Sequence, residues 1–207
     1  MDGMEIDKLG IKFLVADPAS VSLKSLVPVF HTWIQKQSVA GHLLIDVHDY
    51  SHIHNGPGIL LVAHEGNFSM DMAGGRPGLL YYRKQPLGGT AEDRLAAILK
   101  STLEGCSLLE HEPSVEGKIR FHTGELFVFA NDRLHAPNDE KTLSELGGVV
   151  SAVFTRLLEG REFTLTPISE NPKERFAVRV HTKSPVEIKT LLDRIPLVWS
   201  EYYSGGL

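Results

Sequence analysis

The chain has 207 residues, of which 42% are hydrophobic and 23% are charged, a composition typical of globular proteins and unlike that of disordered ones. Its formal net charge is −5 and its 21 Lys and Arg residues are scattered, which argues against a nucleic-acid partner. No apolar run reaches the roughly 18–20 residues of a membrane-spanning helix, so we expect no membrane association.

We expect a single α+β domain over residues 1–207, because single domains run to roughly 200–250 residues. The one cysteine, Cys106, cannot form an internal disulfide, and a reducing compartment permits it. Residues 1–10 lack the apolar segment of a secretory signal. A soluble, cytoplasmic protein is therefore the expectation.

Strands and helices alternate in the first half of the chain. A helix is predicted from the spacing of apolar residues between Leu23 and Ile34, and Pro28 requires that helix to begin late or to bend. A second helix is expected from a capping Thr90 to about Glu104. The predicted strands of this half span residues 11–15, 42–50, 58–65 and 79–82.

The second half is predicted to contain two hairpins and two helices. The hairpins join residues 118–121 to 125–130 and residues 163–168 to 175–181. The strongest helix covers residues 139–159 and contains Gly147-Gly148. Each glycine costs about 1 kcal/mol relative to alanine, so we expect close packing or a ligand there. The last helix follows Ser184 and ends at Pro196.

Hairpins between helices indicate antiparallel pairing, because parallel strands need crossover connections. The fold class is therefore predicted to be α+β, with antiparallel sheet built from hairpins and four helices packed against it. The element order can also be divided into a tandem βαββ pseudo-repeat, although the residues themselves show no internal similarity.

The stretch from Asp46 to Glu65, DVHDYSHIHNGPGILLVAHE, holds four of the ten histidines and a firmly predicted turn at residues 55–58. His52 and His54 are two residues apart and point to one side of an extended backbone. Paired imidazoles beside carboxylates are typical of Zn, Fe or Mn sites. However, His64-Glu65 lacks the second histidine of the H-E-x-x-H motif, so we assign no metal ligand and no cofactor.

Three functions follow from these residues. The first is a small-molecule-binding domain, with a homodimer as one option for its assembly. Its ligand would be contacted by His48, His52 and His54, with Arg76 as an anion-binding residue in a glycine-rich turn. The second is a hydrolytic enzyme, with or without a metal. Its base would be His64 or His54, oriented by the carboxylate of Glu65 or Asp46. The third is a structural or interaction protein without a small ligand, in which the histidines only face water.

Overall fold

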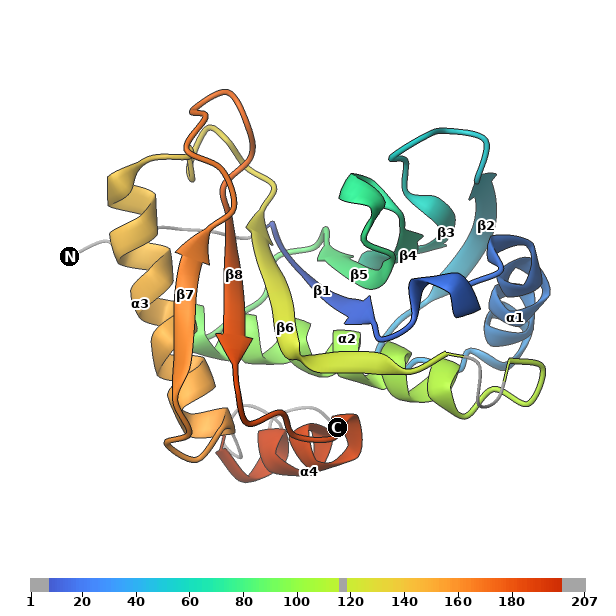
Figure 1. The fold of residues 1–207 in the computed structure, drawn as a ribbon. Helices are drawn as coiled ribbons and strands as arrows, with labels where there is room; N and C mark the ends of the chain where they lie inside the picture. Colours follow the sequence, from blue (N-terminus) through green and yellow to red (C-terminus); the bar gives the residue numbers. More distant parts are fainter. Residues whose placement is uncertain (1–7, 116–118, 199–207) are drawn as a thin grey trace.

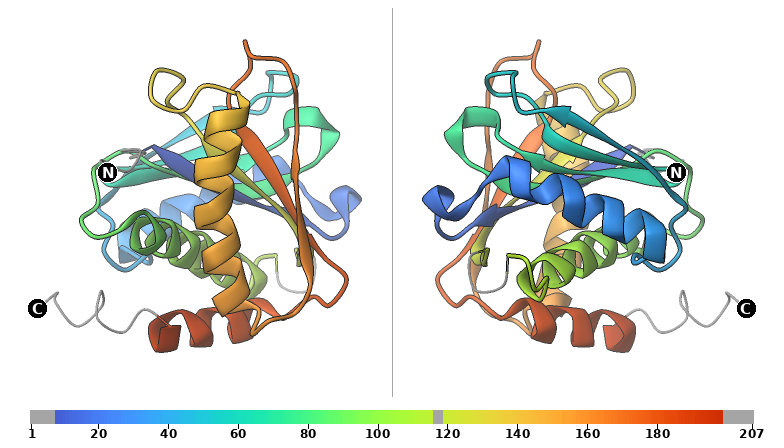
Figure 2. Two further views of the ribbon diagram at one scale, coloured as in Figure 1. Left: turned by 90° about the vertical axis from the view of Figure 1, so that its left-hand side faces the viewer. Right: turned by 90° about the vertical axis from the view of Figure 1, so that its right-hand side faces the viewer.

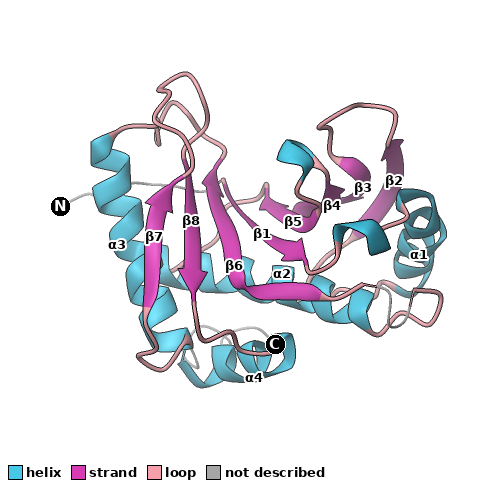
Figure 3. Cartoon of the chain, viewed as in Figure 1, coloured by secondary structure: helices cyan, strands magenta, loops and turns pink. Residues whose placement is uncertain are grey.

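The computed structural model describes residues 8–115 and 119–198, which form one antiparallel β-sheet and four α-helices (Figures 1 and 3). The strands are β1 (Leu9–Val15), β2 (Leu44–Tyr50), β3 (Gly58–Ala63), β4 (Gly66–Asp71), β5 (Gly78–Arg83), β6 (Phe121–Ala130), β7 (Phe163–Pro167) and β8 (Ala177–Thr182). The helices are α1 (Leu23–Lys36), α2 (Ala91–Glu110), α3 (Glu140–Leu157) and α4 (Ile188–Val198). This architecture confirms the predicted α+β class.

The strand order of the eight-stranded sheet is β2-β3-β4-β5-β1-β6-β8-β7. All neighbouring strands are antiparallel. The first strand of the chain, β1, lies in the interior, with β5 on one side and β6 on the other. It therefore joins the strands that precede α2 in the sequence, β2 to β5, to the strands that follow α2, β6 to β8.

The two faces of the sheet differ in what covers them, as successive residues of β5 show. Leu79 and Tyr81 belong to the main core, which also contains buried residues of all four helices. Leu80 and Tyr82 point the other way, into a smaller cluster that includes no helical residue. We call this second side the open face, and its cluster consists of Leu14, Leu80, Phe127, Phe129 and Ala177, with Tyr82 packed against them.

The helices form one layer, and each buries the apolar stripe that its sequence predicts. In α1 the stripe contains Leu26, Phe30 and Trp33, and this helix packs on β2 and β3. At the other end of the sheet α3 packs on β7, while α2 lies against β1 and β5 and also contacts α4 (Figure 2). The helix α1 begins late, after Ser22, so Pro28 is its sixth residue.

One strand, β4, was missing from the sequence prediction. Its side chains point alternately to the two faces of the sheet, and Phe68 and Met70 are fully buried in the core. It follows β3 after only His64-Glu65, and these two residues differ from the Asn-Gly or Asp-Gly pairs that indicate a tight hairpin. The turn therefore has no recognisable sequence signal, and the predicted strand, residues 58–65, extends through it.

The predicted hairpin around residues 122–124 is wrong, because β6 is one continuous strand from Phe121 to Ala130. A bulge takes up the extra residues: Phe13 of β1 pairs with Leu126, whereas the next residue, Leu14, pairs with His122. Gly124 permits a close approach, since a Cβ there would lie 3.1 Å from the Thr182 carbonyl oxygen. Lys118, the predicted start of the hairpin, lies outside the described residues.

Two expectations about the helices were also wrong. The helix α4 continues through Pro196 to Val198. In α3, beyond its chain neighbours and the nearby backbone of the helix, no described heavy atom lies within 4 Å of the place where a Cβ of Gly148 would be, and Gly147 would meet only Leu143 Cδ1 at 4.0 Å. Close packing therefore does not compensate for these glycines.

The tandem βαββ pseudo-repeat is not confirmed. The four strands β2 to β5 follow α1 in succession, whereas only β7 and β8 follow α3. Of the described helices, none combines the length and apolar character that a membrane span needs.

Candidate functional site

The open face of the sheet contains a cavity of about 570 Å³. It lies between the turn that joins β4 to β5 and the loop that joins β7 to β8, two segments that rise on either side of the open face (Figure 1). The cavity is lined by Lys12, Asp71, Ala73, Gly74, Arg76, Phe127, Phe129, Pro167, Ile168, Ser169, Glu174, Arg175, Ala177 and Arg179.

Two glycines in neighbouring strands make room for the side chains of this site. A Cβ on Gly10 of β1 would lie 2.4 Å from Tyr82 Cδ1, so glycine allows the Tyr82 ring to lie across β1. A Cβ on Gly78 of β5 would lie 2.9 Å from Lys12 Cε. Side chains larger than hydrogen at either position would displace Tyr82 or Lys12, respectively.

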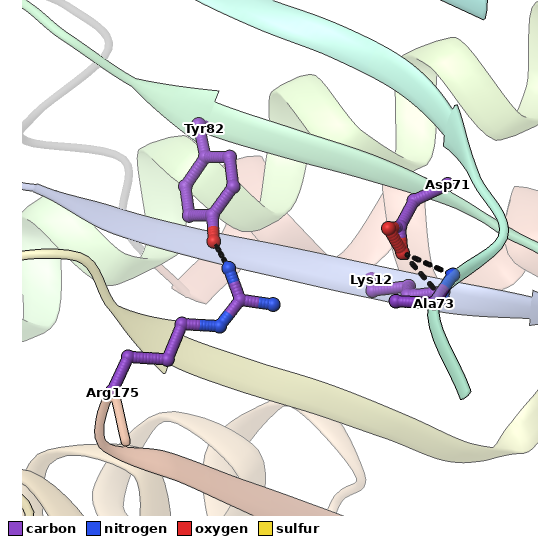
Figure 4. A network of polar contacts seen from close by, with 5 residues as sticks. All are labelled: Lys12, Asp71, Ala73, Tyr82 and Arg175. Atoms are coloured by element: carbon purple, nitrogen blue, oxygen red, sulfur yellow. Dashed lines mark hydrogen bonds and ion pairs between the residues drawn. The ribbon is translucent and has the colours of Figure 1, made fainter. Parts of the chain in front are cut away.

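Lys12 and Asp71 form a buried ion pair on the open face. The Lys12 Nζ donates to Asp71 Oδ1 at 2.8 Å, and the two side chains are only 3% and 8% exposed. The same oxygen accepts the backbone N–H of Ala73 at 3.2 Å, which fixes the start of the turn after β4 (Figure 4). Burial lowers the pKa of Lys12 below its ordinary value of 10.5, although Asp71 opposes that shift, and the charges of Arg175 and Arg76 add to it.

Arg175 extends from the β7–β8 loop over the aromatic side chains of the open face. Its guanidinium carbon lies 4.1 Å from the centre of the Phe129 ring, and its Nη1 donates a hydrogen bond to the Tyr82 hydroxyl. The other terminal nitrogen is directed away from Tyr82, toward the side on which Lys12 and Asp71 lie (Figure 4). Burial lowers the pKa of Arg175, yet arginine stays protonated near neutral pH.

A second pair of arginines shares one carboxylate at the rim of the cavity. Arg76 Nη1 donates to Glu125 Oε1 at 2.9 Å, and Arg179 Nη1 lies 3.8 Å from the same oxygen. The Arg76 guanidinium also lies 5.0 Å from the centre of the Phe127 ring. Arg76, the anion-binding candidate of the sequence, thus takes part in the cavity.

The lining of the cavity is positive in an otherwise acidic protein. Four cationic side chains and two carboxylates line it, which leaves two positive charges in excess, whereas the chain has a net charge of −5. The two carboxylates of the lining are Asp71, which pairs with Lys12, and Glu174. Glu125 lies outside the lining, where it pairs with Arg76 and lies near Arg179. Arg175 forms no ion pair with any carboxylate of the described residues, so it is the cation most available to an anion.

The stretch 46–65 forms the β2–β3 hairpin that was predicted, at one edge of the sheet. Asp46 and His48 come together there, with 3.6 Å between Oδ2 and Nε2, and their side chains are about half exposed at 58% and 48%. Neither these residues nor His52 and His54 line the open-face cavity. The assignment of His48, His52 and His54 as ligand contacts stays a prediction, and so does the catalytic assignment of Asp46, His64 and Glu65.

The register of the β2–β3 hairpin separates the other candidate residues of the stretch 46–65 from one another. Tyr50 pairs with Gly58 and Leu44 pairs with Ala63, so His52 and His54 lie beyond one end of the hairpin and His64 and Glu65 beyond the other. Six residues of extended strand, roughly 20 Å, separate the two ends.

The two members beyond the second end, His64 and Glu65, are adjacent in sequence. Glu65 accepts the backbone N–H of Leu43 at 2.8 Å, which holds the chain where β2 begins. Within the described residues, no group of three or more His, Cys, Asp or Glu side chains is arranged to hold a metal ion.

The cavity residues other than Arg76 were missed by sequence reasoning. One signal was available: Lys12 stands inside IKFLV, a segment predicted to be a buried strand, and a lysine there needs a partner. The partner Asp71 lies 59 residues further along the chain, and Arg175 comes from a loop more than 150 residues away. Only the register of the sheet brings them together.

Compared with protein-family models and with curated proteins, the sequence matches none, so the functional argument depends on the geometry of the open-face cavity itself.

Proposed function

We propose that this protein is a small-molecule-binding domain that binds a small organic anion in the open-face cavity. The observation that carries the proposal is Arg175, a partly buried cation that faces the cavity and has no carboxylate partner among the described residues. A cation removed from water is unfavourable unless a counter-charge or hydrogen bonds replace the lost hydration. A bound anion would supply that counter-charge.

The dimensions and chemistry of the cavity support the same function. Ligand pockets usually have volumes of about 300–1,000 Å³ and combine apolar walls with a few polar groups, and this cavity of about 570 Å³ combines Phe127, Phe129 and Ala177 with charged side chains. The proposed site thus moves from the 46–65 hairpin to the open face, and Arg76 is common to both assignments.

A thermal-unfolding experiment tests this function. We expect benzoate, phenyl phosphate or sulfate to raise the unfolding midpoint at matched ionic strength, whereas neutral benzamide does not. The Arg175→Met variant should lose the effect, because binding that depends on one charge pair typically weakens more than about tenfold without it. The control Arg156→Met removes an arginine whose partner is Glu92, outside the cavity, and should keep the effect.

Two outcomes would reject the function. One is that none of the three anions raises the midpoint of the unmodified protein. The other is that Arg175→Met responds to the anions as the unmodified protein does, since the stabilisation would then arise elsewhere on the surface.

We further propose that the protein is cytoplasmic and acts without nucleic acid, because its one cysteine, Cys106, is a fully buried free thiol and its net charge is negative. A homodimer is also proposed. It is supported by two apolar side chains beside the edge strand β2, Leu43 and Ile45, which are 57% and 54% exposed. Light scattering tests the dimer, and the mass of a single chain would reject it.

A further inference from the structure

We infer that the anion is the carboxylate of a molecule with an apolar hydrocarbon body, and that it binds to one edge of the Arg175 guanidinium. This inference rests on the proposed function and narrows it to one chemical class. Four observations lead to it: the free edge of Arg175, the charges around it, the backbone of the neighbouring turn, and the apolar side chains that extend from it.

The guanidinium of Arg175 has one edge fixed and one edge free. Nη1 donates to the Tyr82 hydroxyl, and the ring of Phe129 lies against the guanidinium at 4.1 Å, so the orientation of the group is set before any ligand arrives. Nε and Nη2 form no hydrogen bond with the described residues, and Nη2 is directed away from Tyr82 (Figure 4). Two parallel N–H groups on one edge match the two oxygens of a planar carboxylate.

The surrounding charges favour a monoanion over a dianion. The four cations of the lining face three carboxylates, Asp71 and Glu174 in the lining and Glu125 beside it, which leaves one positive charge in excess. Arg175 is the cation without a carboxylate partner among the described residues. A phosphate monoester carries a charge of about −1.5 to −2 near neutral pH. Such a group would need a second free cation and would be repelled by Asp71, whose charge acts on Arg175.

The backbone near the cavity is not arranged to hold a phosphate. Phosphates are commonly bound by free backbone N–H groups of loops or helix N-termini. In the turn that lines the cavity, the N–H groups of Ala73, Gly75 and Arg76 already donate to Asp71, Met72 and Ala73, respectively. In this turn the N–H of Gly74 alone has no acceptor among the described residues, and one such group does not form a phosphate-binding loop, so the side chain of Arg175 is the main donor for an anion.

Apolar side chains continue from Arg175 toward the rim of the cavity. Phe129 of β6 pairs with Ala177 of β8, and the backbone N–H of Ile168 donates to the Ala177 carbonyl at 2.9 Å, so the three residues lie side by side across the sheet. Ile168 is 46% exposed. A hydrocarbon body that starts at Arg175 can cover Ala177 and Ile168 and remove this apolar surface from water.

Calorimetric titration with four compounds of graded chemistry tests the inference on the full chain. Octanoate has the carboxylate and the body, octanamide lacks the charge, octyl phosphate carries the dianion, and acetate lacks the body. We expect octanoate to bind at least about tenfold more tightly than each of the other three. Equal or tighter binding of octyl phosphate would overturn the carboxylate, and equal binding of acetate would overturn the apolar body.

Variants locate the two parts of the site. Arg175→Lys keeps the charge and removes the two-pronged edge, so octanoate affinity should fall by about tenfold or more. Ile168→Ser, at an exposed position, should weaken octanoate several-fold and leave acetate unchanged. Unaltered octanoate affinity in either variant would contradict the placement, and circular dichroism of both variants confirms that they are folded.

The outcomes separate this inference from the proposed function. If octyl phosphate or sulfate stabilises the protein through Arg175 while octanoate does not bind, the carboxylate inference fails and the anion-binding function stands. If no anion in either experiment binds, the anion-binding function fails as well.

Discussion

A lysine and an aspartate with almost no exposure to solvent lie on the open face of a sheet whose other residues there are largely apolar. Removing two charges from water is costly, and a buried ion pair of this kind is often no more stabilising than apolar residues of the same volume. The pair Lys12–Asp71 is therefore better explained by the cavity it lines than by stability.

The coupling of this pair can be measured. Lys12→Met should lower the free energy of unfolding by about 3–5 kcal/mol, because it leaves the Asp71 carboxylate buried without a partner. In the Lys12→Met background, the further change Asp71→Asn should cost much less than it does alone. Urea unfolding of the two single variants and the double variant gives both values, and strictly additive effects would show that the residues act independently.

The contribution of Glu125, near the rim of the cavity, to the stability of the protein depends on pH. The hydrogen bond from Arg76 holds the pKa of Glu125 below its ordinary value of 4.5. A carboxyl group whose pKa is lowered by folding contributes stability above its unfolded pKa, and this contribution is lost as the pH falls below about 4.5 through the lowered value.

The substitution Glu125→Gln should therefore change the free energy of unfolding by an amount that depends on pH. Near neutral pH the variant should be less stable by about 1 kcal/mol, a value that allows for solvent screening of the half-exposed Arg76. The difference should shrink as the pH falls below about 4.5 and through the lowered pKa of Glu125. Urea unfolding across this range measures it, with Arg76→Met as the matched variant that removes the partner. A difference that stays constant with pH would refute the ion pair as its source.

At the scale of single elements, α3 contains Gly148, whose cost to the helix is offset by no tertiary contact among the described residues. Gly148→Ala should raise the free energy of unfolding by about 1 kcal/mol, because the added methyl group meets nothing in the described structure and alanine is the better helix former. Thermal or urea unfolding is the measurement.

A matched glycine in another helix should respond in the opposite direction. A Cβ on Gly105 of α2 would lie 2.9 Å from Leu79 Cδ2 and 3.2 Å from Phe68 Cε1, inside the core. Gly105→Ala should therefore destabilise the protein, or gain less than Gly148→Ala if Leu79 moves aside. A loss of stability in Gly148→Ala would indicate that its exposed face has a partner.

The helices and most strands could be predicted from sequence because their signals are local. The apolar spacing of α1 and the capping box of Thr90 and Asp93 lie within the elements they define. The two strands that were predicted wrongly depend on distant partners. The connection from β3 to β4 contains no turn-forming residue, and β6 stays continuous because it pairs with β1 on one side and with β8 on the other. No local pattern contains that information.

The density of histidines was a poor guide to burial. Among the ten histidines His42 alone is buried, and its Nε2 lies 2.7 Å from the hydroxyl of Tyr81 on the helix side of the sheet. The histidines of the 46–65 stretch are exposed. A sequence shows which residue types occur close together along the chain. A binding site needs residues from several strands to point into one cavity, and this depends on the register of strand pairing.

For the whole molecule, the interior position of β1 predicts how the chain unfolds. Since β1 pairs with β5 and with β6, the two parts of the sheet cannot separate without breaking it, and we propose a single cooperative domain. In a Trp199→Phe variant, Trp33 of α1 is the remaining tryptophan and reports on the β2 end of the sheet.

We expect Trp33 fluorescence and far-ultraviolet circular dichroism of this variant to give the same urea midpoint. The two probes differ in reach, because circular dichroism averages over all the helices while the fluorescence is local. Two separated midpoints would mean that the β2 end unfolds on its own, and the single-domain proposal would then be wrong.

The place of β1 also matters while the protein is being made. This strand leaves the ribosome before either of its partners, and the second partner, β6, ends at Ala130. At roughly 5–20 residues per second, the two appear on the order of ten seconds apart. During that time an apolar strand has an unpaired edge that could join neighbouring nascent chains. Lys12 lies in the middle of that strand, and we expect its charge to oppose such pairing before it comes to line the cavity.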